Sequence, residues 1–343
     1  MVEQGTHKPL AGGSNPPSAT TPPSPLDRLA AAVAAGTDGL PDDATLILAA
    51  SGGPDSTALL HGAARLVSNA ARQWSLVVAH VDHQLRPDSG SDAAQVAGMA
   101  SALELECTLH RADVAAIARA EHRSLEDAGR LARYRFLEEL AAGLGPRALI
   151  ATAHTADDVA ETMLMRMARG SGLRGLRGIP ARRGRIVRPL LDARRRELRA
   201  ALDEAGIAYL LDPTNDDASA AARNRVRAEV LPALERLNPQ AVEAFQRLAR
   251  LVADDDDALD AIAAAELARR RTDESIDWRE PPVRAIGRRV LRLVTGEPSP
   301  SAERIEAVLN AAEGPRGGLT IELGGGRSAS VRDRRITLHR VQE

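Results

Sequence analysis

A short glycine-rich segment offers the clearest chemistry in this sequence. The run Ser51-Gly52-Gly53-Pro54-Asp55-Ser56 joins an apolar stretch to a stretch with helical spacing. The two glycines let the backbone approach an anion, and the amides of the turn and of the first helical turn then point at it. Ser51 and Ser56 add hydroxyl donors, whereas Asp55 needs a bridging Mg²⁺ to approach a phosphate. The segment predicts a phosphate-binding loop; the alternative is a plain Gly-Gly-Pro turn with polar caps.

Two further polar clusters follow later apolar stretches. The first contains His80 and Asp82, and the second contains His154, Asp158 and Glu161. Because parallel strands end at one edge of a sheet, both clusters are expected beside the phosphate loop. Asp158 and Glu161 are three residues apart on a predicted helix, so they share a face that suits a metal or a cationic substrate. The alternatives are acids that complement a helix dipole and histidines that are capping or buried residues.

Arginine dominates the basic residues of this chain. Lys8 is the only lysine among 45 basic side chains. On one predicted helix, Arg130 and Arg133 share a stripe with Glu126, which suits either phosphate binding or intrahelical ion pairs. From Arg169 to Arg199, eleven arginines stand against two acids, an electrostatic footprint suited to RNA. The alternative is an arginine bias spread over solvated helices.

The segments around these residues alternate in pattern, as in an α/β fold. Short apolar runs typical of buried strands alternate with segments of helical spacing. The expected strands are 45–50, 75–81, 107–110, 148–153 and 186–190. The expected helices are 26–35, 57–69, 92–105, 124–142 and 156–169. This alternation predicts a doubly wound parallel sheet with helices on both faces.

The second half of the sequence has a different pattern. The expected helices are 218–235, 239–268, 281–293 and 301–312, and the expected short strands are 318–323, 328–332 and 336–339. We therefore expect four parts along the chain. They are a disordered tail at 1–25, a nucleotide-binding catalytic domain at 26–215, a helical connecting region at 216–280, and a small mixed α/β C-terminal domain at 281–343.

Composition narrows the class of protein. A chain of 343 residues, 44% of them hydrophobic, can fill more than one core. No stretch approaches the roughly 20 apolar residues of a membrane helix, and the N-terminus lacks an apolar signal region, so we expect a cytoplasmic protein. Cys107 is the only cysteine, which excludes an intrachain disulfide and any CxxC motif for zinc, iron–sulfur or persulfide chemistry.

The motifs, taken in order, resemble those of one family. The string SGGPDS is similar to the PP-loop of the ATP pyrophosphatase superfamily, whose fold is of the adenine nucleotide alpha-hydrolase type. Between residues 46 and about 240 follow HVDHQLR, ARY, TAHTADDVAET, RGSGLRGLRGIP, RPLL, DPTNDD and RNRVR. Each piece is moderately specific, and the ordered set resembles the tRNA(Ile)-lysidine synthetases.

This resemblance implies a two-step ligation that uses ATP and Mg²⁺. In that family, ATP adenylates the wobble cytidine (C34) of a tRNA(Ile) with a CAU anticodon, and free L-lysine then attacks C2 to form lysidine. The tRNA thereby changes from methionine to isoleucine identity. The implied catalytic residues are Asp55, Arg130, Arg133, His154, Asp158 and Glu161. The implied ATP-binding residues are the loop Ser51–Ser56, His80 and Asp82, with Asp55 also holding the metal.

The resemblance also implies macromolecular partners. The residues expected to contact tRNA are Arg169, Arg174, Arg177, Arg188, Asn224, Arg225 and Arg227. The C-terminal domain at 281–343 is expected to bind tRNA as well, and a homodimer is left open.

Three alternative functions compete with this interpretation. A PP-loop tRNA thiolase needs reactive cysteines, whereas Cys107 is a lone residue typical of a small buried hydrophobe. An NAD⁺ or GMP synthetase-like amidating enzyme would not explain the basic run. A non-catalytic RNA-binding protein with a nucleotide fold is disfavoured by the intact Asp55, Asp158 and Glu161.

Overall fold

The chain folds into two units, called unit 1 and unit 2 below. Unit 1 comprises Met1–Ala153 and Gly184–Leu211, and unit 2 comprises His154–Arg183 and Asp212–Glu343. The structure, a computed structural model, describes residues 22–84, 89–211, 222–272, 275–296, 298–314 and 318–340. The predicted tail at 1–25 lies largely outside these residues. The predicted limits at 215 and 280 stay a prediction, and unit 1 lacks 154–183, which the predicted catalytic domain includes.

A parallel sheet forms the centre of unit 1. Its strands are β1 (Thr45–Ala49), β2 (Ser75–Asp82), β3 (Glu106–Arg111), β4 (Ala148–Ala151) and β6 (Ile186–Val187). They lie in the order β3-β2-β1-β4-β6, and the two-residue strand β5 (Arg182–Arg183) precedes β6 in the chain. After β3 the chain returns to place β4 on the other side of β1. The carboxyl ends of β1 and β4 therefore flank the topological switch point, where doubly wound folds bind ligands.

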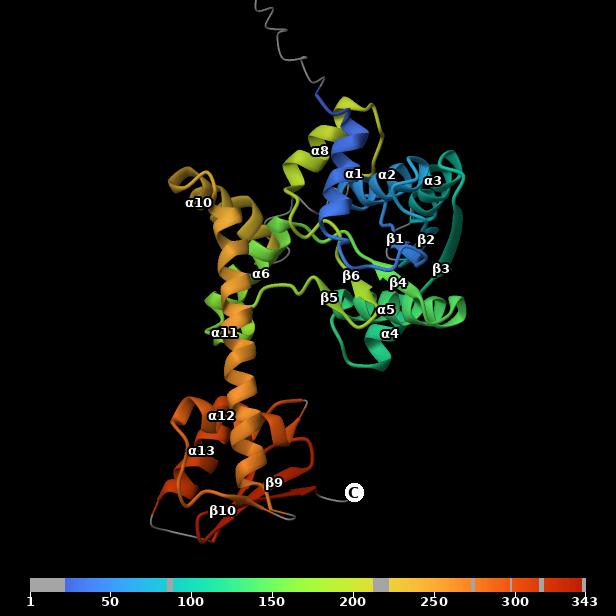
Figure 1. Ribbon diagram of the computed structural model, residues 1–343. Helices are drawn as coiled ribbons and strands as arrows, with labels where there is room; N and C mark the ends of the chain where they lie inside the picture. Colours follow the sequence, from blue (N-terminus) through green and yellow to red (C-terminus); the bar gives the residue numbers. More distant parts are fainter. Residues whose placement is uncertain are drawn as a thin grey trace, which may run out of the picture. The chain divides into compact units, whose positions relative to one another are not determined.

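Helices cover both faces of this sheet (Figure 1). One face carries α1 (Pro25–Ala35), α2 (Pro54–Ser68), α3 (Ser89–Ala102) and α8 (Arg195–Glu204), and the other carries α4 (Val114–Ala120) and α5 (Leu125–Leu144). Side chains alternate across β1, so Leu46 and Leu48 pack in one core and Ile47 packs in the other. A strand buried on both faces reads as a continuous apolar run, which is why the sequence predicts it.

Unit 2 is mainly helical and ends in an antiparallel sheet. Its helices are α6 (Ala156–Ala168), α7 (Leu173–Leu176), α9 (Ala222–Arg225), the π-helical turn η2 (Val226–Val230), α10 (Leu231–Leu237), α11 (Ala241–Arg270), α12 (Arg284–Thr295) and α13 (Ala302–Glu313). The sheet has the order β7 (Ile276–Asp277), β10 (Arg335–Arg340), β9 (Arg327–Arg332), β8 (Leu319–Glu322).

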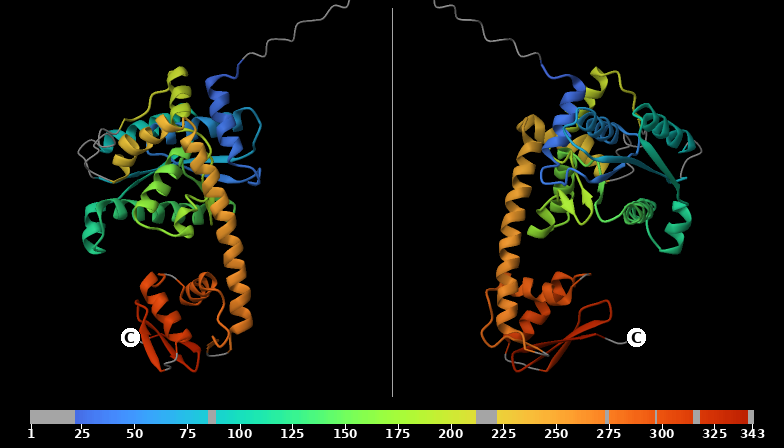
Figure 2. Two further views of the ribbon diagram at one scale, coloured as in Figure 1. Left: turned by 90° about the vertical axis from the view of Figure 1, so that its left-hand side faces the viewer. Right: turned by 45° about the vertical axis from the view of Figure 1, so that its right-hand side comes forward.

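Helix α11 is the long orange helix in Figure 2. It takes part in two separate hydrophobic cores. Near its start, Val242 packs with Ala156, Ala160 and Leu231. Near its end, Ala263 packs in a core that includes the fully buried Trp278. The helix therefore connects the α6–α10 region to the C-terminal sheet and its two helices.

The doubly wound sheet and the small mixed C-terminal region are confirmed. The expected strand at 186–190 is only Ile186–Val187, and the helix expected at 218–235 is divided into α9, η2 and α10, with 218–221 outside the described residues. The sequence did not predict α4, α8 or β7. None of the described helices combines the length and hydropathy needed to cross a lipid bilayer.

Candidate active site

The loop after β1 has the geometry of an anion-binding turn. Gly53 is the N-cap of α2, and Pro54 occupies the first turn of the helix. The first amides of a helix have no partner within it, and together with the helix dipole they favour an anion. The Ser56 hydroxyl accepts a hydrogen bond from the Ser51 amide at 3.1 Å and donates to the Gly53 carbonyl at 3.0 Å. Ser56 therefore braces the loop from within.

Only one of the two loop glycines has a conformation that requires glycine. Gly52 has a φ of +83°, and a Cβ there would lie 2.4 Å from Cδ1 of Leu210 and 3.2 Å from Cγ2 of Val96. The Leu210 amide also donates a 2.8 Å hydrogen bond to the Gly52 carbonyl. At Gly53, a Cβ would meet only the Ser51 hydroxyl, at 3.6 Å. Close packing by the Leu210 segment thus fixes the loop at Gly52.

Asp55 of this loop is held by an arginine that the sequence did not single out. Arg195 Nε donates to Asp55 Oδ2 at 3.0 Å, and each side chain is 21% exposed. Arg195 is the first residue of α8, between Arg194 and Arg196. Three arginines at a helix N-terminus oppose the helix dipole, and this placement is the sequence signal that points to an acidic or anionic partner nearby.

The end of β2 is fixed to the ends of its neighbours by polar contacts. The buried His80 has Nδ1 2.8 Å from the Ala50 carbonyl, which places a hydrogen on Nδ1. Asp82 Oδ1 accepts from the Gln84 amide at 2.9 Å. Burial alone would raise the pKa of Asp82, but the hydrogen bonds from Gln84 and the Ser89 side chain outweigh it and lower the pKa. Asp82 is therefore ionised; the ATP contacts of His80 and Asp82 stay predictions.

A histidine outside the predicted set contacts Arg133, one of the two predicted arginines. Arg133 Nη2 lies 3.3 Å from Nε2 of His83. Burial, and then the charge of Arg133, lowers the pKa of His83 to about 4. A guanidinium can only donate, so Nε2 accepts and the proton lies on Nδ1, which is buried with no hydrogen-bond partner among the described residues. Arg130 stacks on Tyr134 at 4.9 Å, so the ion-pair alternative with Glu126 is not formed in the described part of the chain.

In unit 2, the two carboxylates predicted to suit a metal or a cationic substrate have different surroundings. Asp158 Oδ2 accepts from the amide and the hydroxyl of Thr155, both at 2.8 Å, and so caps α6. Glu161 is fully buried and accepts from Arg227 Nε at 2.8 Å and Nη2 at 3.0 Å. Arg223 Nε lies 3.7 Å from the same carboxylate. Both carboxylates therefore have protein partners in unit 2.

Arg177, a predicted tRNA contact, is engaged in an ion network. Its Nη1 lies 3.1 Å from Asp256 and 2.6 Å from Asp257. Asp256 is fully buried in the middle of α11, and its other oxygen contacts Arg289 at 2.5 Å. Arg289 also pairs with Asp260. The network joins the segment after α7, helix α11 and helix α12.

The other predicted tRNA contacts divide by exposure. Arg188 is buried, and Arg227 is bound to Glu161. Asn224 is half-buried. The exposed members of the set are Arg169, Arg174 and Arg225. Contact with tRNA stays a prediction for all of them.

The donor set suits a metal that arrives with its nucleotide. Within the described ranges, no three His, Cys, Asp or Glu side chains gather as a self-sufficient metal site. Mg²⁺ is commonly bound by one or two carboxylates together with substrate phosphates, so the single carboxylate of Asp55 beside an anion-binding turn fits it. His154 is half-buried, and Cys107 is half-buried on β3, where burial raises the pKa of its thiol.

Comparison with known proteins gives consistent matches. The PP-loop domain family matches residues 27–234. Over 234 residues the chain is 46% identical to the tRNA(Ile)-lysidine synthase of Salinispora tropica, covering 66% of this chain and 68% of that protein. Over 227 residues it is 43% identical to the tRNA(Ile)-lysidine synthase of Geobacter sulfurreducens, covering 65% of this chain and 47% of that protein.

A solved structure shares the fold. A U34-tRNA thiolase from Methanococcus maripaludis with a 4Fe–4S cluster aligns with a TM-score of 0.54 at 16% identity, covering 66% of this chain and 80% of that chain. At this identity the likeness shows the fold alone. From its ordered motifs, its sheet topology and its relatives, this chain belongs to the tRNA(Ile)-lysidine synthase family of PP-loop proteins.

Proposed function

We propose that this protein is a carbon–nitrogen ligase that joins free L-lysine to C2 of the wobble cytidine (C34) of a CAU-anticodon tRNA(Ile). The observation that carries this proposal is the braced glycine loop at the switch point of the sheet, in a chain of this family. The match covers less than half of the Geobacter relative, so the loop and the ordered motifs of this chain support the proposal more than overall length does.

The first proposed step is adenylation of the base. Cytosine O2 attacks the α-phosphorus of ATP, an O–P bond forms, and pyrophosphate leaves. The amides at the start of α2 and the hydroxyl of Ser51 would bind the phosphates, and Arg130 or Arg133 would hold the α-phosphate. Mg²⁺, held by Asp55 and by ATP itself, would neutralise charge on the triphosphate. His80 and Asp82 would order the neighbouring strand end.

The second proposed step forms the new carbon–nitrogen bond. The deprotonated lysine ε-amine attacks C2, the C2–O2 bond breaks, and AMP leaves with O2 on its phosphate, while the nitrogen loses a further proton. Asp158 and Glu161 would attract the incoming ammonium group, and one of them would accept a proton. Because Glu161 is already bound by Arg227, the ammonium would have to share or replace that partner. His154 would contact the adenylate.

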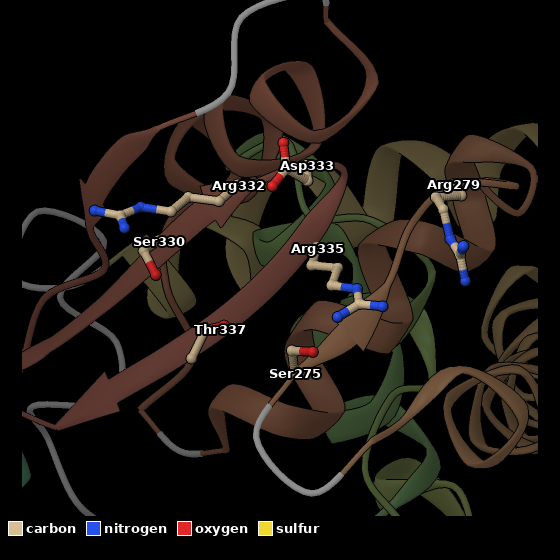
Figure 3. A pocket seen from close by; sticks show the side chains of 7 residues that line it. All are labelled: Ser275, Arg279, Ser330, Arg332, Asp333, Arg335 and Thr337. Atoms are coloured by element: carbon tan, nitrogen blue, oxygen red, sulfur yellow. The ribbon is translucent and has the colours of Figure 1, made fainter.

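The C-terminal sheet supports the proposed tRNA contact of residues 281–343. Residues of β9, of β10 and of the segments that flank β7 line a hollow of about 500 Å³. Figure 3 shows the side chains that line it. Its lining residues are Ser275, Arg279, Ser330, Arg332, Asp333, Arg335 and Thr337. On these strands, Val331 and Ile336 point into the core, so alternation places the arginines and hydroxyls on the outer face. Arginines and hydroxyls are common donors to nucleic-acid phosphates.

Lysine transfer can be tested directly. Folded protein is incubated with ATP, Mg²⁺, labelled lysine and an unmodified CAU-anticodon tRNA(Ile), and both tRNA-bound lysine and released pyrophosphate are measured. We expect both products, and neither with an Asp55→Asn variant or with elongator tRNA(Met). Protein that binds ATP but transfers no lysine to this tRNA would overturn the proposal. A cytoplasmic location and a homodimer stay predictions.

A further inference from the structure

The N-terminus of α8 carries an arrangement that is unfavourable on its own. Arg194, Arg195 and Arg196 place three positive charges where the helix already has its positive dipole end. The acid in this first turn is Glu197. Arg195 turns to Asp55, on another helix 140 positions away in the chain. An arrangement that opposes the helix dipole needs a compensating partner, and Asp55 provides it.

Asp55 has the opposite relation to its own helix. It lies in the first turn of α2, where the dipole stabilises a carboxylate and where the loop amides would bind phosphate. A bare carboxylate at this place would repel a triphosphate, so a cation must stand between them. Arg195 is such a cation, and it is in direct contact with Asp55 Oδ2 at 3.0 Å.

We propose that Arg195 is a positioning residue that exchanges partners when nucleotide binds. It holds Asp55 in place while the loop has no nucleotide, and it turns to the pyrophosphate portion of ATP once Mg²⁺ takes the Asp55 carboxylate. Mg²⁺ and a guanidinium on one carboxylate repel each other, whereas the planar guanidinium fork matches phosphate oxygens. This inference rests on the proposed function only in taking ATP as the nucleotide.

The exchange predicts two opposite effects of removing the charge. In Arg195→Gln, Mg²⁺ no longer competes with a guanidinium, so the Mg²⁺ concentration for half-maximal nucleotide binding falls severalfold. At saturating Mg²⁺ the same variant binds nucleotide about tenfold more weakly, because a charge-assisted contact to phosphate is lost. Arg195→Lys keeps the charge and restores the Mg²⁺ requirement. The neighbouring Arg196 is exposed, so Arg196→Gln is the matched control and changes neither quantity.

The test measures binding without catalysis. A non-hydrolysable ATP analogue is titrated calorimetrically into wild-type protein and each variant over a series of Mg²⁺ concentrations, with neither tRNA nor lysine present. A lower Mg²⁺ requirement together with weaker nucleotide binding at saturating Mg²⁺ in Arg195→Gln, with neither change in Arg196→Gln, supports the exchange. A lowered melting temperature with both binding quantities unchanged, or a raised Mg²⁺ requirement, overturns it.

A second variant keeps the test decisive if Arg195→Gln folds poorly. In Asp55→Asn, nucleotide binding should lose most of its dependence on Mg²⁺, and melting curves should show a folded protein. Retention of the full wild-type Mg²⁺ dependence in Asp55→Asn overturns the exchange. The proposed function fails separately: wild-type protein that binds the analogue with Mg²⁺ but transfers no lysine overturns the ligase activity alone.

Discussion

Arg227 donates a hydrogen bond to each carboxylate oxygen of the buried Glu161, from Nε to Oε1 at 2.8 Å and from Nη2 to Oε2 at 3.0 Å. A two-point contact of this kind fixes the orientation of both groups. Glu161 is also where the sequence predicts the substrate ammonium. The stability of this pair and the binding of lysine are therefore expected to depend on the same carboxylate.

The first prediction concerns this pair. Arg227→Met leaves Glu161 buried without its main partner, and we expect the free energy of unfolding to fall by about 3 kcal/mol. This loss is at the low end for a broken buried pair, because Arg223 Nε lies 3.7 Å from the Glu161 carboxylate and still provides a nearby positive charge. Urea denaturation measures it. Arg225→Met, at an exposed position on the same segment, should stay within about 0.5 kcal/mol, and equal losses in the two variants would contradict the prediction.

The second prediction separates the two loop glycines. Gly52→Ala places a Cβ 2.4 Å from Leu210 Cδ1 at a φ of +83°, so we expect a loss of at least about 2 kcal/mol and weaker nucleotide binding. Gly53→Ala meets only a hydroxyl at 3.6 Å and should stay within about 0.5 kcal/mol. Thermal melting and nucleotide titration check both. A Gly52→Ala variant as stable as Gly53→Ala would show that the loop relaxes freely.

The third prediction concerns pH. Burial and Arg133 lower the pKa of His83 from 6.5 to about 4 in the folded protein. Between these values the unfolded chain binds more protons, so stability falls as the pH drops from 6.5 towards 4. We expect a contribution of about 1 kcal/mol after allowing for partial exposure, removed in His83→Gln.

Nuclear magnetic resonance of the imidazole provides the direct check on His83. Arg133→Gln should raise the pKa of His83, but only in part, since burial is the larger cause. A pKa near 6.5 in the wild-type protein would show that His83 is solvated.

The fourth prediction concerns the ion network on α11. Burial alone would raise the pKa of Asp256, but Arg289 and Arg177 outweigh it and lower the pKa. Asp256→Asn would leave both guanidinium groups without their buried counter-ion, at an expected cost of about 3–5 kcal/mol. The neighbouring Asp257 is 64% exposed, so Asp257→Asn should cost no more than about 1 kcal/mol. Chemical denaturation compares the two, and similar values would mean that burial of Asp256 is unimportant.

The fifth prediction concerns the outer face of the C-terminal sheet. If Arg332 and Arg335 contact phosphates, Arg332→Gln and Arg335→Gln should each weaken tRNA binding and lower the salt dependence of the affinity by about one phosphate contact. Arg269→Gln removes an exposed charge from α11 that does not line the hollow, and it serves as the control. Equal effects in all three variants would indicate a nonspecific loss of charge.

Local features of the site could be predicted from the sequence because their causes are local. The apolar run of β1, the glycines after it and Pro54 at the start of α2 lie within a dozen positions, and the structure contains each of them. Helix α8 was not predictable from its pattern, because its buried face consists only of Leu198, Ala201 and Leu202 and the rest of the helix is mostly charged. Strand β7 is too short to show a pattern.

The ion pairs that organise the site could not be predicted in the same way. Arg195 and Asp55 are 140 positions apart, and Arg227 and Glu161 are 66 apart. Residue spacing reports neighbours within a turn or along a strand, and it does not indicate which of many arginines meets which acid. The sequence predicts an RNA contact for Arg227 but not the contact of its guanidinium with Glu161, and the RNA contact stays a prediction.

The 30 residues of α11 set the distance and the relative rotation between two cores of unit 2. At 1.5 Å per residue the helix is roughly 45 Å long, and its two cores lie near opposite ends. One residue inserted between them would turn one core by about 100° relative to the other, whereas seven residues, close to two whole turns, would nearly restore the phase. Insertions or deletions in this helix should therefore be tolerated in multiples of whole turns, which change the distance between the two cores but keep their relative orientation.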